Sequence, residues 1–122
     1  GVALHNVANQ TVSWGTVYAH PHYGAGVMFW DDSRTRDGYV CEGNYVHDLK
    51  VIVEDVELDT SERGWLLGFY DRAQTRDNRI EDVELVIPKG TLQFPYCRLP
   101  GRGSVTVAEF REAFPGVSVT EV

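Results

Sequence analysis

Short runs in which apolar and polar residues alternate make up most of this chain, and turns rich in Gly, Pro, Asp and Asn separate them. Alternation with a period of two is typical of β-strands that have one buried face. In the first run, from Thr11 to Ala19, a bend is expected at Gly15. The expected strands span residues 11–19, 27–30, 45–53, 65–70, 83–87, 92–96 and 117–122. Short strands at this spacing predict an antiparallel sandwich or barrel.

The clearest alternation is in residues 45–53, where every second residue is predicted to face the core. Those positions are Tyr45, His47, Leu49, Val51 and Val53. At Glu54 and Asp55 the apolar pattern moves to the opposite parity, as expected at a bulge or a turn.

A short helix is expected near the C-terminus. Thr106 and Glu109 have the spacing of a capping box. Phe110 and Phe114 lie four residues apart and would share one face of the helix. Because isolated helices of this length are marginal in water, the sequence predicts a helix over residues 106–114 that is appended to the sandwich and docked by its phenylalanines.

A ten-residue pattern occurs twice, forty residues apart. Residues 29–38 and 69–78 share Phe, an aromatic residue, Asp, three variable positions, Thr-Arg-Asp and a final Gly or Asn. Each copy is typical of a buried strand that ends in a polar turn. Two copies indicate two similar halves or two equivalent corners, and are too few to indicate a propeller or a solenoid.

The acids and arginines of these turns are the main binding candidates. Alternating charges with Arg forks are typical of a polar rim that recognises another protein. Turn capping and local ion pairing explain the same residues without any partner. Tyrosines in the surrounding loops could instead stack on sugars or anchor a protein contact. The candidate binding residues are Asp31, Asp32, Arg34, Arg36, Asp37, Asp71, Arg72, Arg76, Asp77, Tyr23, Tyr39 and Tyr45.

Metal and catalytic sites find weaker support. His20 and His22 have the spacing of β-sheet ligands, but the sequence offers no obvious third ligand. The acidic turns are similar to the calcium loops of βγ-crystallins, yet the Ser/Thr-Ser ending of that motif is missing and interleaved arginines oppose a dication. No serine lies in an elbow or triad context. We therefore expect no cofactor, no metal and no catalytic residue.

Composition narrows the class of partner. The chain has 122 residues, 43% of them hydrophobic, and a formal net charge of −7. This charge argues against a nucleic-acid or anionic-membrane surface, which would need clustered Lys and Arg. No apolar run approaches the ~20 residues that span a bilayer. The size fits one domain over residues 1–122, in which residues 1–10 carry no strong pattern and are assigned to a loose arm or an edge strand.

The two cysteines, Cys41 and Cys97, are compatible with one disulfide or with two reduced core thiols. Each ends a strand-like segment, and a bridge between them would close a long loop, which the chain-entropy model values at roughly 4 kcal/mol. We predict the bridge and, with it, an extracytoplasmic location.

Three short motifs resemble those of small secreted β-sandwich domains of streptomycetes and related bacteria, most of them of unknown function. The motifs are Trp14-Gly15-Thr16-Val17-Tyr18, Phe29-Trp30-Asp31-Asp32 with Asp37-Gly38, and Pro88-Lys89-Gly90-Thr91 running on to Phe94 and Cys97. The resemblance covers residues 12–98, with Trp30 where these domains often have Cys and Lys89 in place of an acid. It implies secretion and an immunoglobulin-like fold, and it implies no catalytic residues. The expected fold is thus an all-β, antiparallel immunoglobulin-like β-sandwich of about seven strands with one short C-terminal helix.

The leading functional hypothesis is a secreted, non-catalytic module that binds another protein, as an adaptor subunit of a larger secreted assembly or as an enzyme inhibitor. One alternative is a carbohydrate-binding module that uses exposed Tyr and Trp residues. The other is a small hydrolase or a calcium-binding βγ-crystallin-like domain.

Overall fold

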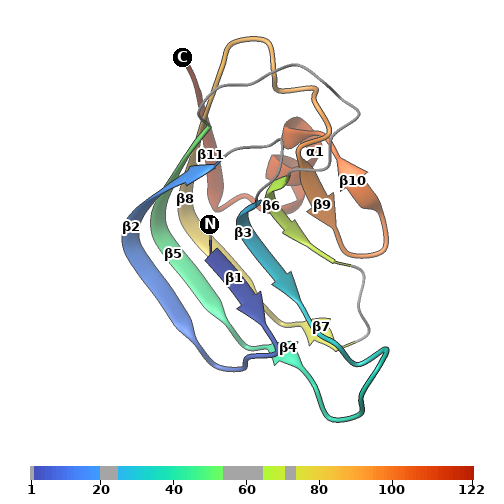
Figure 1. The fold of residues 1–122 in the computed structure, drawn as a ribbon. Helices are drawn as coiled ribbons and strands as arrows, with labels where there is room; N and C mark the ends of the chain where they lie inside the picture. The colour runs from blue at the N-terminus through green and yellow to red at the C-terminus, as the bar shows by residue number, and fades with distance from the viewer. Residues whose placement is uncertain (1, 20–24, 54–64, 71–73) are drawn as a thin grey trace.

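The fold is built almost wholly from β-strands that pair in parallel (Figure 1). The computed structural model describes residues 2–19, 25–53, 65–70 and 74–122. Its elements are β1 (Val2–His5), β2 (Thr11–Ala19), β3 (Ala25–Trp30), β4 (Cys41–Glu42), β5 (Tyr45–Val53), β6 (Trp65–Phe69), β7 (Thr75–Arg76), β8 (Arg79–Ile87), β9 (Cys97–Leu99), β10 (Gly103–Val105), α1 (Val107–Ala113) and β11 (Val117–Glu121).

The strands form three sheets, and the chain visits them in rotation. The four-stranded sheet has the order β11-β8-β5-β2, the five-stranded sheet β1-β3-β6-β9-β10, and the two-stranded sheet β4-β7. From β2 to β9 the chain passes twice through the four-, five- and two-stranded sheets in that order and then begins a third circuit. Each circuit lays its strands beside those of the previous one, so the architecture is a parallel β-solenoid.

One circuit takes 34 residues when it is measured between paired strands of the four-stranded sheet or of the two-stranded sheet. Thr11 pairs with Tyr45 and Tyr45 with Arg79, while Val83 pairs with Val117 and Cys41 with Thr75. The five-stranded sheet keeps the parallel pairing but not the spacing, since Phe29 pairs with Phe69, forty residues on. The forty-residue repeat in the sequence is therefore a local match between β3 and β6 rather than the period of the fold.

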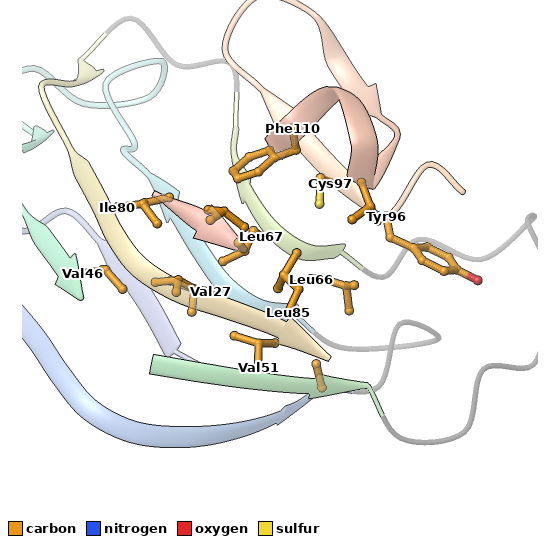
Figure 2. Close-up of a cluster of buried hydrophobic side chains, with 14 of the residues drawn as sticks. Val27, Val46, Val51, Leu66, Leu67, Ile80, Leu85, Tyr96, Cys97 and Phe110 are labelled. Atoms are coloured by element: carbon orange, nitrogen blue, oxygen red, sulfur yellow. The ribbon is translucent and has the colours of Figure 1, made fainter. Parts of the chain in front are cut away.

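Apolar residues from each circuit stack inside the solenoid. Val17, Val51, Leu85 and Val119 occupy one position in four successive strands of the four-stranded sheet, and the two middle residues are completely buried. Figure 2 shows Val27, Leu67 and Cys97 of the facing sheet in the same core. Burial of such stacks is the main favourable term in folding.

A helix closes the C-terminal end of this core. The helix predicted from the Thr106–Glu109 capping box is present over Val107–Ala113, and both hydrogen bonds of the box are formed. Phe110 is completely buried and stacks on Phe114 with ring centroids 4.9 Å apart. Phe114 in turn stacks on Phe69 at 5.2 Å, so the helix extends an aromatic column inside the solenoid.

Left-handed residues recur at the same points of successive circuits. Trp14, Asp48 and Asp82 have φ of 58°, 53° and 49°, and each lies 34 residues after the one before. A residue in this conformation interrupts the alternation of a strand. Val46 is therefore completely buried, whereas the side chains of Tyr45 and His47 face outward. The prediction that Tyr45 and His47 face the core was wrong because the parity shift falls at Asp48; Glu54 and Asp55 lie outside the described residues.

The prediction of an antiparallel immunoglobulin-like sandwich was also wrong. Among the described strands, β9 and β10 alone pair antiparallel. A solenoid strand has one face in the core and one in solvent, so its alternation does not differ from that of an antiparallel sheet. Residues 92–96, predicted as a strand, form turns instead, while the predicted last strand is present as β11.

The predicted disulfide between Cys41 and Cys97 is absent, because both cysteines are free and completely buried. Cys41 lies in the two-stranded sheet and Cys97 in the five-stranded sheet. The Cys41 thiol donates to the carbonyl oxygen of Leu4 at 3.0 Å. Burial raises the pKa of Cys41 to about 11 and that of Cys97 to about 12, so both are inert core thiols. The predicted extracytoplasmic location loses this support and stays a prediction.

Candidate functional site

Aromatic and ionisable side chains gather on the outer face of the four-stranded sheet. We call this group the outer-face cluster; its members are Trp14, Tyr45, His47, Asp48, Arg79 and Glu81. They come from β2, β5 and β8, which lie side by side (Figure 1). The parallel register aligns Tyr45 with Arg79 and His47 with Glu81, so four of the six form two neighbouring pairs.

Tyr45 is held by three partners. Its ring stacks on that of His47 with centroids 4.4 Å apart, and the Arg79 guanidinium lies 4.3 Å from the Tyr45 centroid. Its hydroxyl donates to Glu81 Oε2 at 2.6 Å, while Arg79 Nη2 donates to Glu81 Oε1 at 2.7 Å. Glu81 thus accepts from two neighbours at once, which fixes the orientation of all three side chains.

His47 is oriented by Asp48. The two side chains contact each other through His47 Nδ1 and Asp48 Oδ2 at 2.6 Å. The left-handed backbone at Asp48 places consecutive side chains on the same side of the strand. Among the described residues, no hydrogen bond to His47 Nε2 is found, so this atom can donate to or accept from a ligand.

Trp14 is the most exposed large apolar side chain of the described residues, with 78% of its surface accessible. Its ring is nearly perpendicular to that of His47, with centroids 6.5 Å apart. Left-handed backbone is costly for a bulky residue. The structure therefore keeps a large indole at an unfavourable conformation and in contact with water, which is typical of a binding residue rather than a packing one.

Hydrogen bonds shift the pKa values of three ionisable groups in this cluster. The bonds from Arg79 and Tyr45 hold the pKa of Glu81 below its usual range. The same bond to Glu81 raises the pKa of Tyr45, and Glu81 raises the pKa of Arg79. At neutral pH the cluster thus presents a carboxylate, a phenol and a guanidinium in fixed places.

Acids outnumber bases along the rest of this face. Lys50 lies 3.5 Å from Glu84, which also accepts from Thr120 at 2.8 Å. Asp82 lies at the same level as Asp48 and is exposed. The face offers many acceptors and few unpaired cations, a balance that suits hydroxyl groups better than phosphates or carboxylates.

The binding surface predicted on the two repeated turns stays a prediction, but one of its residues, Asp31, is buried rather than exposed. Asp31 is completely buried and accepts from the Ser33 amide, the Gln74 amide and the Thr75 hydroxyl at 2.8, 3.1 and 2.7 Å. Burial by itself raises the pKa of Asp31, but these hydrogen bonds together outweigh it and hold the pKa below its usual value. Asp31 thus has a structural role, since it fastens two circuits together.

The two turns are also not equivalent in space. Thr75 and Arg76 form β7 and pair with Cys41 and Glu42, whereas Thr35 lies in a turn that bonds back to Asp32. The chain takes eleven residue steps from Trp30 to its strand at Cys41, but five from Tyr70 to Thr75. The earlier copy therefore carries an insertion that the later copy lacks.

The remaining candidates of these turns contact near neighbours. Arg76 pairs with Glu42 at 3.0 Å, Arg36 donates to the Tyr39 hydroxyl at 3.5 Å, and Asp32 binds His5 at 2.6 Å. Asp77 holds a left-handed corner with φ of 55°. Arg34 and Asp37 are exposed. Tyr23, Asp71 and Arg72, together with His20 and His22, lie outside the described residues.

Sequence reasoning identified Tyr45 but missed the other members of the outer-face cluster. A signal was present in three segments spaced by 34 residues: Asn9-Gln10-Thr11-Val12, Gly43-Asn44-Tyr45-Val46 and Asp77-Asn78-Arg79-Ile80. Aligned in this way, they place Trp14, Asp48 and Asp82 at one corner. The alignment would also have put Tyr45 and His47 on the outer face.

Within the described residues, no group of three or more His, Cys, Asp or Glu side chains could hold a metal ion, and no helix is long and apolar enough to cross a membrane. Comparisons with family models, curated proteins and solved structures found no match to this chain. The comparisons therefore assign no family. Of what the resemblance to secreted actinobacterial domains implies, the fold is contradicted and the secretion stays a prediction.

Proposed function

We propose that this protein binds a neutral glycan on the outer face of its four-stranded sheet. The observation that carries the proposal is the exposed Trp14 ring beside the ordered Tyr45, His47 and Glu81 side chains. Sugar rings have apolar faces and hydroxyl edges, so they are recognised by an aromatic surface flanked by hydrogen-bonding groups.

The arrangement supports a glycan over an acidic ligand because of its charges. Arg79 is already paired with Glu81, and Lys50 lies beside Glu84. An anionic polymer approaching this face would meet Asp48, Asp82 and Glu84 with no clustered cations to attract it. Hydroxyl groups can donate to the same carboxylates without repulsion.

The width of the site indicates an extended ligand. The cluster spans three neighbouring strands, and adjacent strands lie about 4.8 Å apart. Trp14 on β2 and Glu81 on β8 are two strands apart, so one ligand contacting both would cover about 10 Å. That span matches about two sugar units rather than a single one.

Affinity electrophoresis in gels containing soluble polysaccharides tests the proposal. The wild-type chain should be slowed by at least one neutral polymer, such as xylan, galactomannan or mixed-linkage β-glucan, and not by polygalacturonate. Trp14→Ala should weaken this retardation by roughly fivefold or more, because it removes the stacking surface.

Tyr39→Ala is the control: Tyr39 was a candidate binding residue on sequence grounds, but its partly exposed ring lies in the turn that follows β3 and contacts Arg36, outside the outer-face cluster. Its retardation should equal that of the wild type. The proposal is wrong if no neutral polymer slows the wild-type chain, or if both variants lose binding equally.

A further inference from the structure

The described chain exposes two large aromatic side chains, and both lie on β2. Trp14 has 78% of its surface accessible and Tyr18 has 60%. Every other Trp, Tyr or Phe of the described residues is at least partly buried. Trp14 belongs to the outer-face cluster, whereas Tyr18 takes no part in it. The exposure of Tyr18 therefore needs a separate explanation.

Tyr18 lies on the same outer face of the four-stranded sheet as that cluster. Val17 packs against the buried core. Successive side chains of a strand point to opposite faces, so Thr16 and Tyr18, on either side of Val17, point outward. Both are exposed. The outer face thus continues along β2 beyond the cluster.

The parallel register places two aliphatic residues beside Tyr18. Tyr18 pairs with Ile52, and Ile52 pairs with Val86. Both aliphatic side chains are partly exposed. We call Tyr18, Ile52 and Val86 the apolar row. Contiguous apolar surface on a face that meets water is typical of an interaction site.

Hydrogen-bonding groups separate the apolar row from Trp14. Thr16 pairs with Lys50 and Lys50 with Glu84, and these three residues lie two positions before the apolar row in their strands. Thr16 offers an exposed hydroxyl, while Lys50 Nζ and Glu84 Oε1 are 3.5 Å apart. Along β2 a ligand would therefore meet an indole, then polar groups, then a phenol ring.

We infer that the apolar row is a second stacking subsite for the proposed glycan, which runs as a linear chain along β2 from Trp14 to Tyr18. This inference rests on the proposed function, because a sugar chain presents apolar ring faces to both aromatic residues and hydroxyl groups to the polar residues between them.

The spacing of the two rings sets the length of the ligand. Four residue steps of about 3.3 Å separate Trp14 from Tyr18, which is about 13 Å along the strand. If about 10 Å corresponds to about two sugar units, the two rings are nearly three units apart. A ligand that reaches both has about four units or more, and a disaccharide reaches only one.

Calorimetric titration with oligosaccharides of two lengths tests the inference. The probes are xylo-, cello- and manno-oligosaccharides of two and six units. In the series that binds, Tyr18→Ala should raise the dissociation constant of the six-unit sugar by roughly fivefold, because one stacking contact is lost. The same variant should leave the dissociation constant of the two-unit sugar unchanged. Trp14→Ala should weaken the binding of both.

Tyr18→Phe is the matched control, since it keeps the ring and should bind the six-unit sugar as the wild type does. The inference is overturned if Tyr18→Ala binds that sugar as tightly as the wild type, or if it weakens both lengths equally. Either result, with Trp14→Ala still impaired, leaves the proposed function intact. A wild type that binds none of the six oligosaccharides contradicts the proposed function and this inference together.

Discussion

The two ends of this solenoid are finished in different ways. At the C-terminal end, α1 inserts the fully buried Phe110 and exposes charged residues to solvent. At the N-terminal end, Val12 and Val17 of β2 pack against the core but remain partly exposed, and residues 1–30 contain no Asp, Glu, Lys or Arg. Terminal repeats of a solenoid need a polar outer surface for solubility. The two ends of the described fold therefore differ in what covers the core, which is a helix at one end and the partly exposed valines of β2 at the other.

Substitutions at the two ends of the solenoid should differ most in how far they lower the free energy of unfolding. Phe110→Ala removes a completely buried ring from the aromatic column, and we expect a loss of about 3–5 kcal/mol in the free energy of unfolding. Val12→Ala, in the partly exposed N-terminal layer that β1, β2 and their connection form (residues 2–19), should cost less than about 1.5 kcal/mol. Urea unfolding of both variants measures the difference. Equal losses would show that the two ends are equally packed.

A polar stack ties the N-terminal layer to the rest of the solenoid. Asn44 is completely buried; its amide nitrogen donates to the Val7 carbonyl and to Asn78 Oδ1, and its oxygen accepts from the Gln10 amide. The stack therefore links three successive circuits at one corner.

Asn44→Ala should cost roughly 2 kcal/mol, because it leaves buried backbone groups without partners. Asn44→Ala should increase the rate of hydrogen exchange more at the backbone amide of Gln10 than at the amides of α1. Asn78→Ala is the comparison, since Asn78 donates to the Cys41 carbonyl and should loosen the next circuit instead. If Asn44→Ala speeds exchange uniformly over the molecule, the N-terminal layer is not a separate unit.

Local elements were predictable from the sequence, but their pairing was not. The capping box at Thr106 and Glu109 defines the helix by contacts within four residues, and the run from Thr11 to Ala19 is a strand as predicted. Pairing depends on residues 34 apart, whose identities differ between circuits at most positions, as at Tyr45 and Arg79. The forty-residue repeat was the stronger pattern because β3 and β6 do align there, but that alignment ends where the turns begin.

The candidate site was missed for a related reason. Alternation alone placed His47 on the buried face, since the left-handed residue at Asp48 that reverses the parity is not visible in an isolated strand. Trp14 was not singled out as a binding residue, because large apolar side chains usually lie inside. Both errors disappear once the three corners at Trp14, Asp48 and Asp82 are aligned.

The smallest expected effect concerns Asp31, which fastens the middle of the solenoid rather than either end. Its folded-state pKa lies below the ordinary 3.8, so its contribution to stability is fully present above that value and is lost as pH falls through the lower folded pKa. Asp31→Asn keeps one acceptor but loses the charge that strengthens the bonds from Gln74 and Thr75, which should cost about 1 kcal/mol at pH 7. Because the wild-type carboxylate is itself protonated in acid, the stability difference between wild type and variant should shrink as pH falls below about 4. Urea unfolding at pH 7 and near pH 3 measures both values, with Asp37→Asn, an exposed residue of the same turn, as the control. A difference that stays constant between the two pH values would show that Asp31 acts through the shape of its side chain alone and that its charge does not stabilise the junction between circuits.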